Sequence, residues 1–164
     1  NILEEIKTLA KSGAKEFFIQ DDNFTISRKR TMAFCRLLIE SGLNIKYKIS
    51  SRVDYLDDEL IEYLIKHRIA LDICPTSNFK LSVVSSLSEH PIRKLFDLGV
   101  QVTVNSDDPL FFGTSITNEY AVLFDDLGFT FEELEKITLN AVNGSFLREE
   151  EKNRLRQEIE NDFP

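Results

Sequence analysis

The chain has 164 residues, 42% of them hydrophobic and 29% charged, with a formal net charge of −8, a balance typical of one soluble, cytoplasmic-type domain. The acidic surplus argues against nucleic-acid and anionic-membrane partners, because binding them needs a basic excess. No apolar run of about 18 residues is present, so no membrane-spanning helix is expected.

Helices and strands are predicted to alternate along most of the chain. Apolar residues at helical spacing behind capping residues predict helices, and short apolar runs that end in polar residues predict strands. We expect strands over 16–20, 46–50, 69–74 and 100–104. We expect helices over 1–12, 27–41, 57–67, from 86 or 88 to 99, and over 115–126, 130–143 and 148–161.

This order of elements predicts an α/β fold with four parallel strands in βα units and extra C-terminal helices. A closed barrel of this type needs eight strands. We therefore expect a half-barrel-like or small open sheet in a single domain spanning residues 1–164. Residues 1–68 carry a net charge of +1 and residues 69–164 a net charge of −9, which marks an internal seam near 68/69.

Polar residues follow all four predicted strands. In parallel α/β sheets ligands bind where the strands end, so these residues are the candidate site. They include Asp21, Asp22, Arg52, Asp107 and Asp108. An ion pair of Arg52 with Asp21 or Asp107 is expected if the strands are neighbours. The alternative is that these residues only form turns and helix caps, as Asp and Asn often do.

Residues 69–164 resemble the carboxyl-terminal part of adenosine deaminase. The resemblance is carried by Cys74-Pro75-Thr76-Ser77-Asn78, by Glu89-His90-Pro91 and by Asn105-Ser106-Asp107-Asp108-Pro109. It implies the last two strands of a (β/α)₈ barrel with its closing helices. It also implies that Asp107 matches a zinc ligand and that Asp108 matches a residue that contacts the purine.

The other site residues of that family have no match in this chain. Its His-x-His pair, its later histidines and its catalytic glutamate are absent, and we expect structural roles for His67 and His90. A catalytic zinc needs three protein ligands. We therefore expect no catalytic residues and no cofactor, with zinc bound only if the deaminase-like site survives.

Residues 1–68 resemble the early barrel units of radical S-adenosylmethionine enzymes of the cobalamin-domain type. The resemblance is carried by Asp21-Asp22-Asn23-Phe24-Thr25, by Ser51-Arg52-Val53-Asp54 and by Gly13-Ala14-Lys15-Glu16-Phe17. It implies that Asp21 and Asp22 lie near bound S-adenosylmethionine. The three cysteines that hold the iron–sulfur cluster are absent, which excludes that chemistry.

Our leading interpretation is an engineered chimera of two barrel fragments without catalytic activity. A first alternative is an adenosine deaminase-like zinc hydrolase, truncated or completed by a second chain. A second is an adenosine-nucleotide-binding module, since both resembled families bind such ligands. Unpaired strand edges and an apolar inner sheet face favour association. They predict either a homodimer through these surfaces or a flattened sheet whose terminal helices cover one face.

Overall fold

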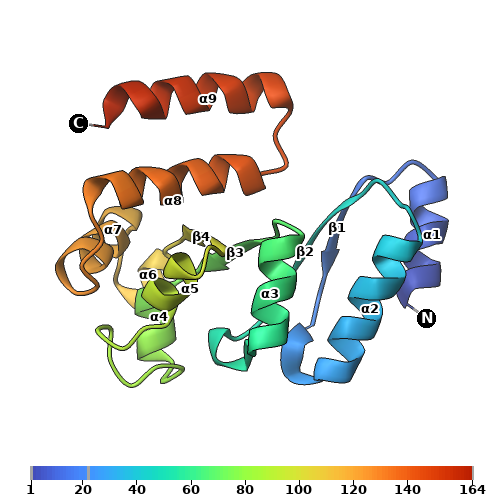
Figure 1. Cartoon of the computed structure of the whole chain (residues 1–164), viewed down its shortest axis with the longest axis horizontal. Coiled ribbons are helices and arrows are strands. Elements are labelled where there is room, and N and C mark those ends of the chain that lie inside the picture. The colour runs from blue at the N-terminus through green and yellow to red at the C-terminus, as the bar shows by residue number, and fades with distance from the viewer. Residues whose placement is uncertain (1, 22, 164) are drawn as a thin grey trace. The chain divides into compact units, whose positions relative to one another are not determined.

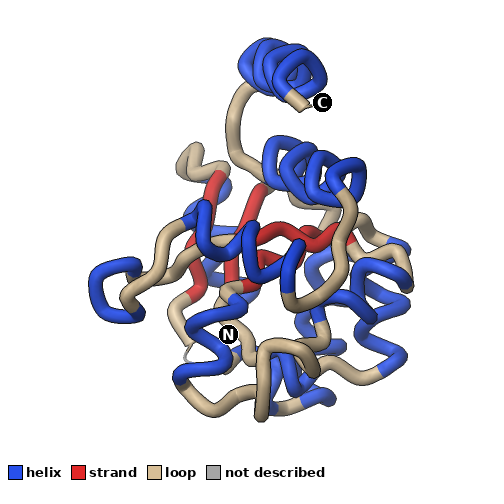
Figure 2. The backbone as a smooth tube through the Cα atoms, turned by 90° about the vertical axis from the view of Figure 1, so that its left-hand side faces the viewer, coloured by secondary structure: helices blue, strands red, loops and turns tan. Residues whose placement is uncertain are grey.

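The computed structural model describes residues 2–21 and 23–163. It divides the chain into two compact units, Asn1–Leu56 and Asp57–Pro164. In the described residues each unit contains a pair of parallel strands with helices beside it (Figures 1 and 2). The predicted α/β class with parallel strands is therefore confirmed. The single domain with a seam at 68/69 stays a prediction.

The first unit is built on the parallel pair of β1 (Glu16–Ile19) and β2 (Lys46–Ile49), in which Glu16 lies opposite Lys46. Its helices are α1 (Ile2–Lys11) and α2 (Arg28–Glu40), with the short 3₁₀ helices η1 (Phe24–Ile26) and η2 (Val53–Tyr55). The ring of Phe34 on α2 packs edge-on against Phe24 at 5.2 Å and against Tyr47 at 6.3 Å. Buried rings thus fix α2 beside the strand pair.

The second unit is built on the parallel pair of β3 (Ala70–Ile73) and β4 (Gln101–Val104). Before and between these strands come α3 (Asp58–Lys66), α4 (Pro75–Lys80) and α5 (Ile92–Asp97). After β4 come α6 (Pro109–Phe112), α7 (Ile116–Asp125), α8 (Phe131–Gly144) and α9 (Glu149–Asp162). The predicted strands and all the predicted helices are found, although α5 begins at Ile92 rather than at 86 or 88.

The core of the second unit lies between β4 and the long helix α8. Val102 on β4 and Ile137 on α8 are fully buried, and Asn140 Nδ2 donates a hydrogen bond of 3.0 Å to the Val102 carbonyl. The end of α8 comes so close to β3 that a Cβ atom on Gly144 would lie 2.8 Å from Cβ of Ala70. The absence of a side chain at Gly144 therefore permits the contact between helix and strand.

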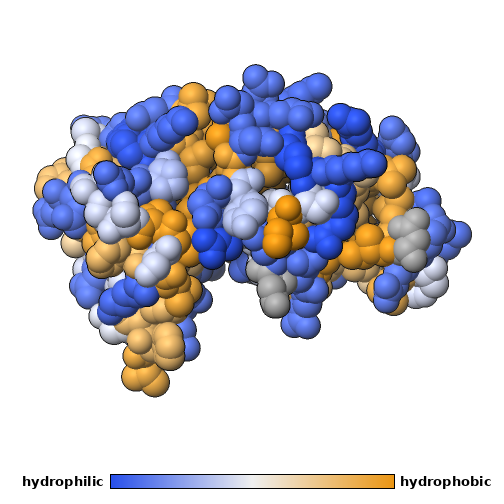
Figure 3. Space-filling model, turned by 90° about the horizontal axis from the view of Figure 1, so that it is seen from below, coloured by the Kyte–Doolittle hydropathy of each residue, from blue (hydrophilic) through white to orange (hydrophobic). Residues whose placement is uncertain are grey.

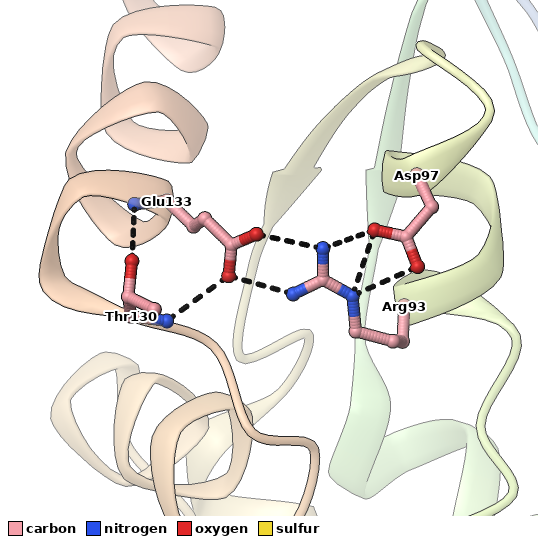
Figure 4. A network of polar contacts seen from close by, with 4 residues as sticks. All are labelled: Arg93, Asp97, Thr130 and Glu133. Carbon is pink, nitrogen blue, oxygen red and sulfur yellow. Dashed lines mark hydrogen bonds and ion pairs between the residues drawn. The ribbon is translucent and has the colours of Figure 1, made fainter.

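An arginine joins α5 to the start of α8 (Figure 4). The Arg93 guanidinium donates two hydrogen bonds to Glu133, of 2.7 and 2.9 Å, and also binds Asp97 on its own helix. It lies 4.1 Å from the centre of the Phe129 ring. Glu133 belongs to the capping box of α8, in which its carboxylate accepts from the Thr130 N–H. These contacts raise the pKa of Arg93 and lower that of Glu133.

The last helix, α9, runs alongside α8 (Figure 1). Lys152 of α9 is buried, and its Nζ donates a hydrogen bond of 2.7 Å to the carbonyl of Asn143, in the last turn of α8. A cation at this end of a helix satisfies a carbonyl that has no partner within the helix. The contact thus fixes the C-terminal helix to the core helix.

Large apolar side chains remain exposed, and Figure 3 shows apolar areas on one face of the molecule. Leu110 and Phe111 on α6 are 95% and 76% exposed, and Phe18 on β1 is 59% exposed. Within the described residues, no helix is long and apolar enough to cross a membrane.

Candidate functional site

The carboxyl ends of β3 and β4 lie at the same edge of their sheet. Ile73 is opposite Val104, and the Asn105 N–H continues the ladder with a hydrogen bond of 2.8 Å to the Ile73 carbonyl. The segment after β3 becomes α4, and the segment after β4 becomes the turn that contains Asp107 and Asp108. Two polar segments far apart in the sequence therefore meet at one point, as expected for parallel strands.

Asp107 is an exposed carboxylate that accepts a hydrogen bond from a buried serine. Its backbone is left-handed, with φ at 56°, and Oδ2 accepts a hydrogen bond of 2.7 Å from Oγ of Ser77. Ser77 lies in α4 and is only 2% exposed. Among the described residues, no hydrogen bond to Oδ1 of Asp107 is found, and the residue as a whole is exposed.

Asp108 is also exposed but is used as the N-cap of α6. Its Oδ1 accepts a hydrogen bond of 3.1 Å from the Phe111 N–H. This is the cap role that the turn-and-cap alternative predicted. A second oxygen of the carboxylate remains for other contacts.

Two further ionisable groups, the Cys74 thiol and the Glu119 carboxylate, belong to or contact the segments around this turn. Burial, together with the carboxylates of Asp72, Asp107 and Glu119, raises the pKa of the Cys74 thiol to about 12. Burial thus favours the protonated thiol at neutral pH, the form in which a cysteine is a poor nucleophile. Glu119 of α7 is completely buried, and the sequence patterns did not single it out as a site residue.

His90 has a structural role, as predicted. Nδ1 accepts a hydrogen bond of 3.1 Å from the Ile92 N–H, so the ring proton sits on Nε2, which lies 3.0 Å from Oδ1 of Asn78. The ring is 3% exposed, and burial lowers its pKa to about 4. A neutral, fully bonded imidazole anchors the entry to α5 to the end of α4.

In the first unit, the candidate residues form local ion pairs. Asp21 accepts hydrogen bonds from the Asn23 N–H at 3.1 Å and from Arg30 at 2.8 Å. Arg52 binds both carboxylate oxygens of Asp54, at 3.0 and 2.8 Å, which lowers the pKa of Asp54. Asp21 and Arg52 therefore each pair with a residue nearby in the sequence, and the expected ion pair between them is not found. Asp22 lies outside the described residues.

The residues that the structure describes do not form a complete metal site. Among them, no group of three His, Cys, Asp or Glu side chains could hold a metal ion. Zinc accepts carboxylate oxygen but needs at least three protein ligands. Asp107 fits the role of one such ligand, because it is exposed and one of its oxygens is fixed by Ser77. The remaining ligands would have to come from elsewhere.

Comparison with known proteins gives the family. The sequence model of the family described as adenosine deaminase matches residues 48–162. The adenine deaminase of Acinetobacter baylyi is 43% identical over 103 residues, which are 63% of this chain and 31% of that protein. The adenosine deaminase of Plasmodium gallinaceum is 43% identical over 100 residues, 61% of this chain and 28% of that protein. The chain thus spans about a third of the length of these relatives.

Solved structures share the fold over nearly the whole chain. The adenine deaminase of Arthrobacter aurescens has a TM-score of 0.71 at 21% identity, covering 97% of this chain and 56% of its own. An amidohydrolase from Burkholderia ambifaria with bound zinc has a TM-score of 0.70 at 20% identity, covering 94% of this chain and 42% of its own. The chain therefore has the fold of part of each of these two proteins.

These comparisons correct the leading interpretation from the sequence. The family match begins at residue 48 and crosses the expected seam at 68/69, so residues 48–68 fall within the deaminase match. Neither a radical S-adenosylmethionine segment nor a chimeric origin is supported, and the interpretation as an inert engineered protein is wrong. The expectation of no cofactor is not supported either, given the zinc-bound neighbour. The deaminase-like alternative fits instead, and the chain belongs to the adenosine deaminase family.

Proposed function

We propose that this chain supplies the carboxyl-terminal part of the active site of a zinc-dependent deaminase that acts on an adenine-containing purine. The observation that carries the proposal is Asp107, an exposed carboxylate at the end of β4 within the family match, with one oxygen fixed by Ser77. Its relatives are named adenine and adenosine deaminases.

In this proposal Asp107 is a zinc ligand. The hydrogen bond from Ser77 fixes the orientation of the carboxylate, and such support of a ligand increases metal affinity. When bound, zinc would activate a water molecule as a nucleophile for attack on the purine. The other ligands and the general acid–base group would have to come from outside the described residues, from further segments of the protein or from a second chain.

Asp108 has a separate role in the proposal. Its Oδ1 is committed to the cap of α6, which fixes the side chain next to the zinc ligand. The other oxygen of the carboxylate can accept a hydrogen bond from an N–H of the base, which is the exocyclic amine or, in free adenine, the imidazole N–H. Asp108 would therefore orient the base, while Asp107 holds the metal.

The test is a hybrid enzyme. Residues 48–162, which match the family model, replace the corresponding segment of the Acinetobacter baylyi adenine deaminase. Ammonia release from adenine and from adenosine is then measured with zinc present. We expect activity in the hybrid and its loss in Asp107→Asn. Asp126→Asn, which changes an exposed Asp at the end of α7, is the control and should remain active. Undiminished ammonia release by Asp107→Asn would contradict the proposal.

A further inference from the structure

Glu119 joins the two chain segments that follow β3 and β4. It lies in the first turn of α7 and is completely buried. One oxygen accepts a hydrogen bond of 3.0 Å from the Thr76 N–H in α4, and the other accepts one of 2.7 Å from Oγ1 of Thr114, just after α6. A buried carboxylate is costly unless it is bonded in this way. Its two bonds therefore restrain both segments at once.

The restrained segments are the ones that hold Asp107. Ser77, the neighbour of Thr76, is buried and donates its hydroxyl to Oδ2 of Asp107. Lys80, also in α4, donates to the carbonyl of Phe112 at the end of α6, so the same two segments are joined a second time. Asp107 itself has a left-handed backbone, a conformation that Asp tolerates better than most other residues with a side chain.

We infer that Glu119 is a positioning residue that fixes the rotamer of Asp107. It acts through Thr76 and the adjacent Ser77 on one side and through Thr114 on the other. The benefit of this positioning rests on the proposed function. A carboxylate already fixed in one rotamer binds a metal without first losing side-chain freedom. The geometry itself does not depend on zinc.

The test measures the rotamer of Asp107 directly. Three-bond couplings to the Asp107 side chain are recorded by NMR on the isotope-labelled 164-residue chain without metal, since these couplings report how far the χ1 angle averages over its staggered positions. We expect one dominant rotamer in the parent chain. Averaged couplings are expected in Ser77→Ala, which removes the hydrogen bond to Asp107 itself. They are also expected in Glu119→Leu, which removes both hydrogen bonds of Glu119, and in Thr114→Val, which removes one of them.

Two variants serve as controls for a general loss of packing around Glu119. Thr114→Ser keeps the hydroxyl and should show the same couplings as the parent chain. Tyr120→Phe removes the hydrogen bond of 2.7 Å to Thr138 from the residue beside Glu119, without touching the Asp107 segments, and should leave the couplings unchanged. If Glu119→Leu fails to fold, Thr114→Val carries the test.

Couplings of the parent chain in Thr114→Val, or equal averaging in Tyr120→Phe, would overturn the positioning role. Averaged couplings in the parent chain itself would do the same. None of these results bears on whether Asp107 binds zinc, which the hybrid enzyme tests. Failure of the hybrid with unaltered Asp107 couplings would instead overturn the proposed function.

Discussion

Acid should destabilise this protein through His90. The folded chain buries the ring as a neutral group, which lowers its pKa to about 4 from an ordinary value of 6.5. Between these values the unfolded chain binds more protons than the folded chain, so the free energy of unfolding falls as the pH falls through this range. The full gap corresponds to roughly 3 kcal/mol, and the part between pH 7.5 and pH 5 to about 2 kcal/mol.

Urea unfolding followed by circular dichroism at pH 7.5 and pH 5 measures this difference. In His90→Asn the new side chain can still accept from the Ile92 N–H but cannot titrate. This variant should be less stable at pH 7.5, and its further loss at pH 5 should be smaller by about 2 kcal/mol than in the parent chain. Most carboxylates titrate below pH 5, so they contribute little to the difference in the free energy of unfolding between pH 7.5 and pH 5.

His67→Gln is the matched control, because His67 is exposed at the end of α3. This variant should keep the full difference between pH 7.5 and pH 5. If His90→Asn and the parent chain lose the same free energy on acidification, the buried neutral imidazole is not the cause and the reasoning fails.

Three further predictions concern packing and assembly. Gly144→Ala should destabilise the chain by about 1–3 kcal/mol in urea unfolding, since its Cβ would lie 2.8 Å from Ala70, and the second change Ala70→Gly should recover part of the loss. Arg93→Lys should lower the free energy of unfolding by roughly 1–2 kcal/mol, because an ammonium cannot form the two parallel hydrogen bonds to Glu133. A loss no larger than that caused by Arg154→Lys, at an exposed arginine, would contradict this prediction. The expected homodimer is tested by light scattering on the purified chain, where the mass of a monomer at every concentration would refute it.

The order of helices and strands was predictable because each depends on neighbouring residues. Asp57 accepts from the Leu60 N–H and Thr130 forms a capping box with Glu133, as their positions before apolar repeats predicted. The short helices α4 and α6 were missed. Each begins with a proline after a strand, and proline is disfavoured in a strand but suits the first turn of a helix.

The candidate site was only partly predictable. The strand-end position of Asp107 followed from the alternation of elements, but its bond to Ser77 joins residues 30 positions apart and depends on how β3 and β4 pair. Glu119 was missed because a glutamate in the first turn of a helix usually faces water and favours the helix dipole. Only the fold shows that it is buried.

Zinc binding by the hybrid enzyme tests the central claim most directly. Metal content per chain is measured by atomic emission after dialysis for the parent hybrid, Asp107→Asn and Asp108→Asn. We expect one zinc ion in the parent hybrid, loss of zinc in Asp107→Asn, and retained zinc with weaker purine binding in Asp108→Asn. Full zinc content in Asp107→Asn would show that this carboxylate is not a ligand and would contradict the account.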